Sequence, residues 1–248
     1  MTGPVANPVP VINPDDYDYI VFFTGAGMSA ESNVPTYRGK GGIWTEYRWQ
    51  DYACQRAFNL DPDKVLDFHE MRRKALLSCD IHDGHRIITQ LQRRNPNVAV
   101  ITQNIDGLHQ RAGTRDVAEL HGSLWRVRCP EHGRSKDFGE KYQRRHCIEC
   151  GEWLRPDITW FEDTLDQRVF YRAAKIIENA DLFISIGTSG VVYPAARLPM
   201  LAYEKGAQTL CINTEYPEND AHFHRVCVGT ASATLKAMFG STFAETND

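Results

Sequence analysis

The chain has 248 residues, which is enough for one large domain or for one domain that carries a smaller insert. Its hydrophobic content of 42% and charged content of 24% are ordinary for a globular protein, and its net charge of −4 gives no general attraction to nucleic acid or anionic lipid. No apolar run is long enough to span a bilayer, and no secretory signal precedes the seven cysteines. We therefore expect a reduced, cytoplasmic protein with no membrane and no direct nucleic-acid partner.

Four apolar runs predict buried strands, at residues 19–24, 98–102, 182–186 and 209–212. Apolar residues at helical spacing predict helices at residues 61–77, 87–94, 167–179 and 195–205. Because strands alternate with helices, the pattern indicates an α/β fold with a parallel sheet that is covered on both faces. A polar and aromatic stretch (about 37–85) and a cysteine-rich stretch (about 129–154) break the alternation and predict a smaller subdomain. Residues 1–16 and 241–248 predict flexible tails.

The first predicted strand runs directly into a glycine-rich turn, Gly25-Ala26-Gly27-Met28-Ser29-Ala30. Glycines in such a turn let the backbone approach a pyrophosphate, whose charge suits the exposed N–H groups at the start of a helix. The pattern predicts dinucleotide binding, although a glycine turn without a ligand would look the same. No acidic residue closes a second strand about twenty residues later, as it does in the usual dinucleotide fingerprint. A plain hydride-transfer dehydrogenase is therefore a poor fit.

The cysteine-rich stretch contains two pairs of candidate metal ligands, Cys129 with His132 and Cys147 with Cys150. In each pair two residues lie between the ligands, and a glycine follows the second ligand. Three thiolates and one imidazole make a closed tetrahedral zinc site, which has a structural role and no open position for catalysis. His146 is a weaker candidate because it lies outside this spacing. A degenerate knuckle without metal is an alternative, and so is a zinc-finger module that binds nucleic acid, because the surrounding stretch is basic.

Several motifs occur in a fixed order: GAGMSAESNVPTYRGKGGIW from Gly25, TQNIDGLH from Thr102, His121-Gly122, RPDITWF from Arg155, GTS from Gly187, and Asn213-Thr214-Glu215. Together they resemble the sirtuin family over about residues 19–231. Asn33 and Tyr37 depart mildly from the family pattern, which usually has glycine and phenylalanine there. At the metal site the family usually has a fourth cysteine, where this chain has His132.

The resemblance implies a Rossmann-like domain that binds NAD and a smaller helical and zinc-ribbon domain inserted into it. It assigns residues 17–38, 86–127 and 157–240 to the first, and residues 39–85 and 128–156 to the second. It also implies His121 as general base, assisted by Asn104. The implied NAD-binding residues are Gly25, Ala26, Gly27, Ser29, Tyr37, Arg38, Trp44, Gln103, Asn104, Ile105, Asp106, Gly187, Thr188, Ser189, Asn213, Glu215 and Ala231. A carboxylate at Glu215 would repel a 2′-phosphate, which favours NAD over NADP.

The implied acyl pocket contains Ala53, His69, Arg72, Ile158, Trp160 and Phe161. Sirtuins that prefer acidic acyl groups have a comparable alanine and a Tyr-x-x-Arg pair, and here His69 stands at the tyrosine position. Arginine binds a carboxylate bidentately, so we expect acidic acyl groups to be preferred. We also expect a protonated His69 to strengthen that preference as the pH falls toward six.

The resemblance predicts NAD-dependent removal of acyl groups (acetyl, and also succinyl or malonyl) from lysines of proteins or peptides, with release of nicotinamide and O-acyl-ADP-ribose. We expect a monomer. A mono-ADP-ribosyltransferase or an NAD hydrolase could use the same pocket, and these activities are the main alternatives. A zinc-dependent binding module with a vestigial nucleotide site is a further alternative, which the complete catalytic cluster disfavours.

Overall fold

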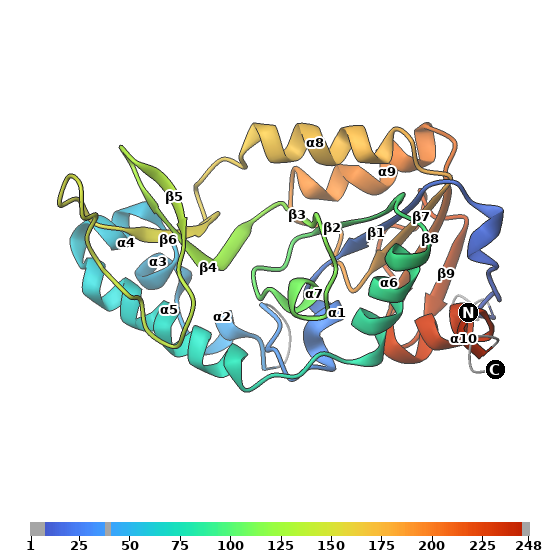
Figure 1. Cartoon of the computed structure of the whole chain (residues 1–248), viewed down its shortest axis with the longest axis horizontal. Coiled ribbons are helices and arrows are strands. Elements are labelled where there is room, and N and C mark those ends of the chain that lie inside the picture. Colours follow the sequence, from blue (N-terminus) through green and yellow to red (C-terminus); the bar gives the residue numbers. More distant parts are fainter. Residues whose placement is uncertain (1–7, 38–40, 245–248) are drawn as a thin grey trace.

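The computed structural model describes residues 8–37 and 41–244 and consists of two modules side by side (Figure 1). The larger module is built on a six-stranded parallel sheet with the strand order β3-β2-β1-β7-β8-β9. Its strands are β1 (Ile20–Thr24), β2 (Val98–Thr102), β3 (Ala118–Glu119), β7 (Leu182–Ile186), β8 (Gln208–Asn213) and β9 (Arg225–Val228). The predicted α/β architecture is confirmed, and the four predicted strands are β1, β2, β7 and β8.

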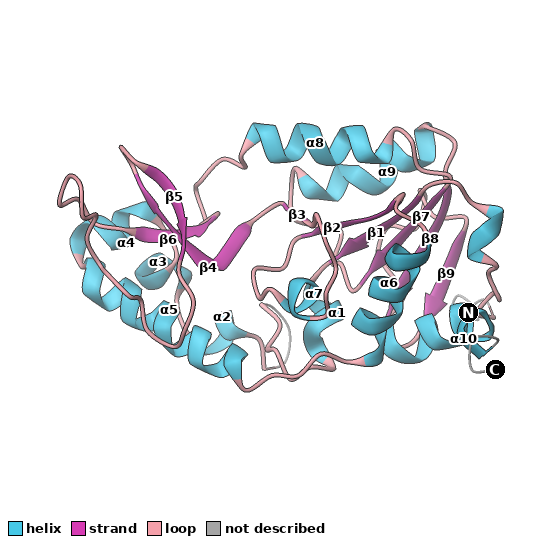
Figure 2. Cartoon of the chain, viewed as in Figure 1, coloured by secondary structure: helices cyan, strands magenta, loops and turns pink. Residues whose placement is uncertain are grey.

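Helices cover both faces of the parallel sheet (Figure 2). One face packs on α6 (Asp83–Arg94) and α10 (Ala231–Ala244), the other on α8 (Gln167–Ile177) and α9 (Leu198–Glu204). The period of two along a strand explains the division, because Phe22 of β1 faces the first pair of helices while Val21 faces the second. The short elements of this module are η1 (Pro14–Asp16), α1 (Ala26–Ala30), α7 (Leu108–Arg111) and η2 (Ala195–Arg197).

The smaller module combines helices with a three-stranded antiparallel sheet of order β5-β4-β6. Its elements are α2 (Ile43–Glu46), α3 (Trp49–Tyr52), α4 (Gln55–Leu60), α5 (Pro62–Leu77), β4 (Gly122–Cys129), β5 (Gly133–Lys136) and β6 (Arg155–Ile158). Asp61 caps α5 by accepting a hydrogen bond from the backbone N–H of Lys64 at 3.0 Å. Leu124 and Trp125 of β4 lie in the same apolar core as Leu66 of α5.

The boundary between the modules differs from the expected one, because residues assigned to the larger module belong to this core. We expected residues 86–127 to belong wholly to the parallel-sheet module, but β4 begins at Gly122 and pairs with β5 and β6. Trp160, which was also assigned to the larger module, is 3% exposed and packs in the core of the smaller one. The reason is burial, because these large apolar side chains cover α5 and α4 and would be exposed to water without them.

The expected flexible tails are wrong for the part of them that the structure describes. Ile12 is 5% exposed in the core of the parallel-sheet module, and its N–H donates to the carbonyl oxygen of Met238 at 2.8 Å. The C-terminal helix α10 continues to Ala244, four residues into the expected second tail. Residues 1–7 and 245–248 lie outside the described residues. Across the described residues, no helix combines the length and the hydropathy that crossing a membrane requires.

Candidate active site and metal centre

The glycine-rich turn follows β1 and packs against the turn that follows β7. The N–H of Gly25 donates to the carbonyl oxygen of Ile186 at 2.9 Å, and that of Gly27 donates to Gly187 at 2.9 Å. A Cβ atom on Gly27 would lie 2.6 Å from the Cα atom of Gly187, whose φ is +61°. The glycines are therefore required by the close approach of two backbone turns. The sequence motif alone did not reveal this reason.

Three polar side chains that we expected to contact the nucleotide form a hydrogen-bonded cluster beside this turn. Asn104 Nδ2 donates to the carbonyl oxygen of Gly25 at 2.9 Å and to Ser29 Oγ at 3.0 Å. Ser29 Oγ donates to one oxygen of Asp106 at 2.7 Å, and the N–H of Leu108 donates to the other at 2.8 Å. Burial raises the pKa of Asp106, while these hydrogen bonds oppose the rise. Each side chain is thus held in one orientation by its neighbours.

A narrow cavity beside this cluster is lined by several expected nucleotide residues and by Arg72 of the expected acyl pocket. Its lining residues are Ala26, Ser29, Val34, Pro35, Tyr37, Arg72, Leu76, Asn104, Ile105 and Asp106. Arg72 donates to the hydroxyl of Tyr37 at 3.2 Å, and its guanidinium lies 5.2 Å from the centre of the Tyr37 ring. Val34, Pro35 and Leu76 were not among the expected site residues. In a sequence, apolar residues of a cavity wall follow the same pattern as core residues. Arg38 lies outside the described residues.

His121 follows β3 and is half-buried at the same edge of the sheet. Its Nδ1 lies 2.9 Å from the carbonyl oxygen of Gln103, which can only accept a hydrogen bond. Nδ1 therefore carries the proton, and Nε2 has a free lone pair. Burial lowers the pKa of His121, although the hydrogen bond to Gln103 opposes the shift. A neutral imidazole with a free Nε2 is the form that can accept a proton near neutral pH.

The remaining expected nucleotide residues also lie at the carboxyl ends of the parallel strands. Thr188 and Ser189 follow β7, and the Thr188 hydroxyl lies 2.9 Å from that of Ser185. Asn213 ends β8 and donates to the carbonyl oxygen of Thr188 at 3.4 Å, and the exposed Glu215 follows it. Ala231 begins α10. In open parallel sheets ligands bind at this edge, so the tertiary structure brings the two halves of the expected site together.

Several residues of the expected acyl pocket belong to the apolar core of the smaller module. The carbonyl oxygen of Ala53 accepts a hydrogen bond from the N–H of Phe161 at 3.0 Å, and Ile158 and Trp160 are buried close by. His69 does not have the expected role, since its Nε2 accepts a hydrogen bond from Trp160 Nε1 at 3.2 Å. Burial holds the pKa of His69 well below its usual value, and Arg72 and Arg155 lower it further. The expectation that a protonated His69 strengthens the acid preference below neutral pH is therefore wrong.

Arg155 and Asp163 hold Trp160 in place, and neither was among the expected site residues. The guanidinium of Arg155 lies 3.6 Å from the centre of the Trp160 ring and donates to Asp163 at 2.6 Å. The same carboxylate oxygen accepts a hydrogen bond from the N–H of Trp160 at 3.1 Å. Arg155 belongs to the RPDITWF motif, so the motif could have indicated it, whereas nothing in the sequence points to Asp163.

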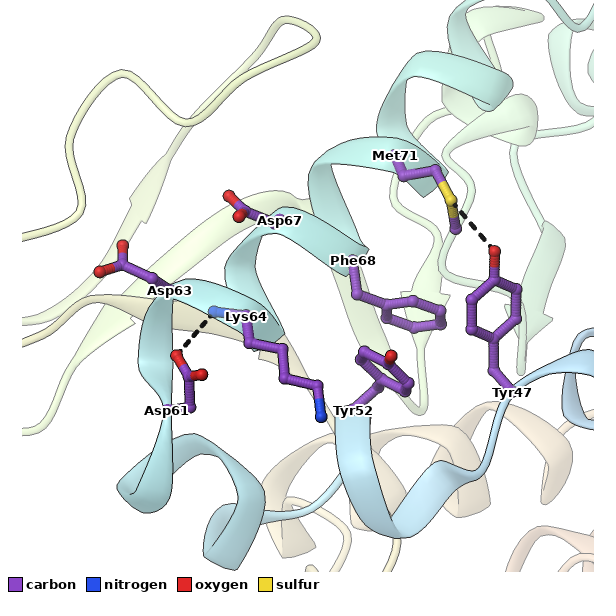
Figure 3. A pocket seen from close by; sticks show the side chains of 8 residues that line it. All are labelled: Tyr47, Tyr52, Asp61, Asp63, Lys64, Asp67, Phe68 and Met71. Atoms are coloured by element: carbon purple, nitrogen blue, oxygen red, sulfur yellow. Dashed lines mark hydrogen bonds between the residues drawn. The ribbon is translucent and has the colours of Figure 1, made fainter.

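A hollow between α5 and the segment that contains α2 and α3 is separate from this site (Figure 3). Its lining includes Tyr47, Tyr52 and Phe68, with Asp61, Asp63 and Asp67 around them. It contains none of the expected site residues. The ring of Phe68 stacks on Trp44 with the centroids 6.1 Å apart, and Trp44 in turn packs against Phe161. Aromatic packing therefore closes this side of the expected site.

The four candidate metal ligands come together at one end of the smaller module. Cys129, His132, Cys147 and Cys150 have ligand atoms that all lie within 4.8 Å of one another. His132 Nδ1 lies 3.7 Å from the sulfur of Cys129 and 3.5 Å from that of Cys147. Three sulfurs and one nitrogen at such separations fit a tetrahedral zinc ion.

The surroundings of the cluster support His132 as the fourth ligand. Its Nε2 faces Glu149 at 3.5 Å, and a carboxylate at this position orients a metal-bound imidazole. His146 is not part of the cluster, because its Nδ1 bonds the carbonyl oxygen of Gly151 at 3.1 Å. The trailing glycines, Gly133 and Gly151, both have a φ of +77°, a conformation that favours glycine.

Comparisons with known proteins agree with this arrangement. A model of the Sir2 family matches residues 25–194. The NAD-dependent protein deacylase of Aquifex aeolicus (strain VF5) is 43% identical over 89% of this chain and 93% of its own length. NAD-dependent protein deacylase 2 of Pyrobaculum aerophilum is 43% identical over 79% of this chain and 80% of its own length. A crystal structure of a Sir2 homologue with NAD is 35% identical, covers 90% of this chain and 89% of that chain, and has a TM-score of 0.81. This chain therefore belongs to the Sir2 family.

Proposed function

We propose that this protein is an NAD-dependent protein-lysine deacylase that uses His121 as its general base. The observation that carries the proposal is the free Nε2 of His121, because Gln103 holds the other ring nitrogen at 2.9 Å. Relatives that are 43% identical to this chain over the aligned residues are named NAD-dependent protein deacylases. NAD is a substrate in this reaction, since it is consumed together with the acylated lysine.

The residues of the sheet edge have separate tasks. Asn104, Ser29 and Asp106 form a fixed set of donors and acceptors for a ribose and a carboxamide, and preorganised groups of this kind orient a substrate. The phosphates and the adenosine ribose would lie at the other half of the edge. The residues there are Thr188, Ser189, Asn213, Glu215 and Ala231. The acyl oxygen attacks C1′ of the nicotinamide ribose, and the bond to nicotinamide breaks. His121 Nε2 then takes the proton of a ribose hydroxyl, which attacks the acyl carbon. The lysine amine leaves that carbon and a water molecule adds to it, which gives O-acyl-ADP-ribose with a hydroxyl at C1′.

For the acyl group, we propose that Arg72 selects acidic chains such as succinyl. Arg72 is 9% exposed, and it donates a hydrogen bond to the neutral hydroxyl of Tyr37. Its charge also acts on the carboxylate of Asp106, with which it forms no salt bridge among the described residues. A buried guanidinium that lacks a directly bonded carboxylate is costly, so an acyl carboxylate would gain a bidentate partner there. His69 supports this site through Trp160 and adds no charge of its own.

The test is mass spectrometry of the products that form from NAD with acetyl-lysine and succinyl-lysine peptides. We expect free lysine, nicotinamide and O-acyl-ADP-ribose in equal amounts. His121→Ala should lower this turnover by at least ~100-fold while NAD binding stays near normal. Free ADP-ribose alone would instead show an NAD hydrolase, and ADP-ribosylated peptide would show a transferase. Either outcome, or an active His121→Ala variant, would overturn the proposal.

A further inference from the structure

Arg126 of β4 makes ion pairs with two strands that belong to different sheets. One of its terminal nitrogens pairs with Glu119 of β3, at the edge of the parallel sheet. Its Nε donates to Asp157 of β6, in the antiparallel sheet, at 2.9 Å. The Glu119 side chain is 10% exposed and that of Asp157 is 4% exposed. The guanidinium therefore joins the two modules through two nearly buried carboxylates.

This contact occurs where the backbone pairing of β4 with β6 is interrupted. Gly122 pairs with Ile158 and Val127 with Pro156, so residues 123–126 stand opposite Asp157 alone. A bulge of this kind loses ladder hydrogen bonds and lets one strand bend away from the other. The ion pair from Arg126 to Asp157 holds the strands together at the point where the ladder does not.

His121 and the acyl pocket lie on the two segments that Arg126 joins. Glu119 stands two residues before His121, and Asp157 directly precedes Ile158 of the expected pocket wall. The carbonyl oxygen of His121 accepts a hydrogen bond from the N–H of Thr159 at 2.9 Å, so the two segments are in register there. Glu119 is also held by Gln110, which donates to its second oxygen at 2.8 Å.

We infer that Arg126 is a positioning residue that sets the place of His121 relative to the acyl pocket. This inference rests on the proposed role of His121 as general base. Without the guanidinium of Arg126, the nearly buried Glu119 loses its ion-pair partner and Asp157 keeps only Arg134, so nothing ties Glu119 of the parallel sheet to Asp157 of the antiparallel sheet. A displacement on the order of 1 Å between a base and its substrate is enough to slow proton transfer strongly.

Two partial reactions separate positioning from general damage. Exchange of labelled nicotinamide into NAD, in the presence of an acyl-peptide, needs only the first step and no proton transfer to His121. Complete deacylation needs both steps. We expect Arg126→Met to lower the kcat of deacylation by at least ~10-fold, with nicotinamide exchange within about twofold of wild type. Arg126→Lys should recover part of the loss, because a cation remains between the two carboxylates.

Arg134→Met is the matched control. Arg134 also donates to Asp157, at 2.9 Å, but it contacts Asp166 of the loop before α8 and not Glu119. Arg134→Met should lower the free energy of unfolding but should not cause a selective loss of deacylation. Glu119→Gln keeps the size of the side chain and removes its charge, so it should reproduce the selective loss if Arg126→Met folds poorly. The effects of Arg126→Met and Glu119→Gln should not be additive, since both variants lose the ion pair between Arg126 and Glu119.

His121→Ala is measured in parallel and distinguishes the two ideas. If His121→Ala deacylates normally, the proposed function fails. If His121→Ala loses deacylation selectively, but Arg126→Met and Glu119→Gln lose both partial reactions in proportion or neither of them, the positioning role of Arg126 is wrong.

Discussion

The indole N–H of Trp160 donates a hydrogen bond to Nε2 of His69 at 3.2 Å, and the two rings stack with an angle of 13° between their planes. Nε2 can accept this bond only while it is unprotonated. Burial, followed by the nearby Arg72 and Arg155, holds the pKa of His69 well below its usual value. His69 is therefore a neutral anchor for Trp160 throughout the physiological pH range.

A first prediction follows for the pH dependence of acyl selection. Because His69 stays neutral, the ratio of kcat/KM for succinyl-lysine to that for acetyl-lysine should be constant between about pH 6 and 8. Steady-state kinetics with both peptides across this range measures the ratio directly. A ratio that rises as the pH falls, with a midpoint between six and seven, would show that His69 is protonated in the pocket after all.

Arg72→Met is the second prediction. The variant keeps an apolar stem and loses the guanidinium, so desuccinylation should fall while deacetylation is spared or improved. The change in the ratio should be on the order of 10-fold or more, which corresponds to about 1.4 kcal/mol. Lys74→Met, on the same helix and 69% exposed, is the control for lost charge and should leave the ratio unaltered. An unaltered ratio in Arg72→Met would mean that Arg72 does not read the acyl group.

The third prediction concerns the metal centre. Purified protein should contain about one zinc ion per chain, and Cys147→Ser should lose it and destabilise the smaller module, because a closed site contributes to folding. His132→Cys should keep zinc, since a thiolate is also a good ligand. His146→Ala should keep it as well, because His146 bonds Gly151 and not the cluster. His132→Ala, by contrast, should lose zinc. Metal analysis together with thermal unfolding of wild type and these four variants checks this. Zinc loss in His146→Ala with retention in His132→Ala would reassign the fourth ligand.

The fourth prediction concerns stability in acid. His85 and His109 are buried neighbours whose ring centres lie 5.0 Å apart. Burial lowers the pKa of both, and that of His109 falls to about 3. Below the usual value of 6.5 the unfolded chain therefore binds more protons than the folded one. The contribution of the two neutral histidines to the free energy of unfolding is fully present above this pH. As the pH decreases below it, the free energy of unfolding falls by up to about 1.4 kcal/mol per pH unit for each histidine.

Urea denaturation between about pH 7.5 and 5.5 measures this loss. His85 tests it well, because neither of its ring nitrogens has a hydrogen-bond partner among the described residues. His85→Leu should make the free energy of unfolding less dependent on pH by the share of one histidine. His222→Gln, outside this cluster, should leave the pH dependence as in wild type. Equal slopes for wild type and His85→Leu would show that His85 does not contribute to the acid sensitivity.

The sequence by itself determined the elements whose signals are local. The apolar runs of β1, β2, β7 and β8 fix buried strands, because a strand covered on both faces must be apolar along its whole length. The spacing of Cys129, His132, Cys147 and Cys150 predicted four ligand atoms that the fold does bring together, since zinc geometry restricts ligand spacing. The motifs around Gly25, Asn104 and His121 identified the family.

The tertiary structure decided what depends on contacts between distant segments. The role of His69 depended on its burial and on Trp160, 91 residues away, because burial disfavours a charged imidazole and only an unprotonated Nε2 can accept the indole N–H. The boundary between the modules depended on where Leu124 and Trp160 found apolar partners, and burial of Ile12 turned an expected tail into part of the core. The ion pairs of Arg126 with Glu119 and Asp157 also have no signal in the local sequence. Surface and buried arginines look alike in a sequence, and only the fold places a carboxylate beside one of them.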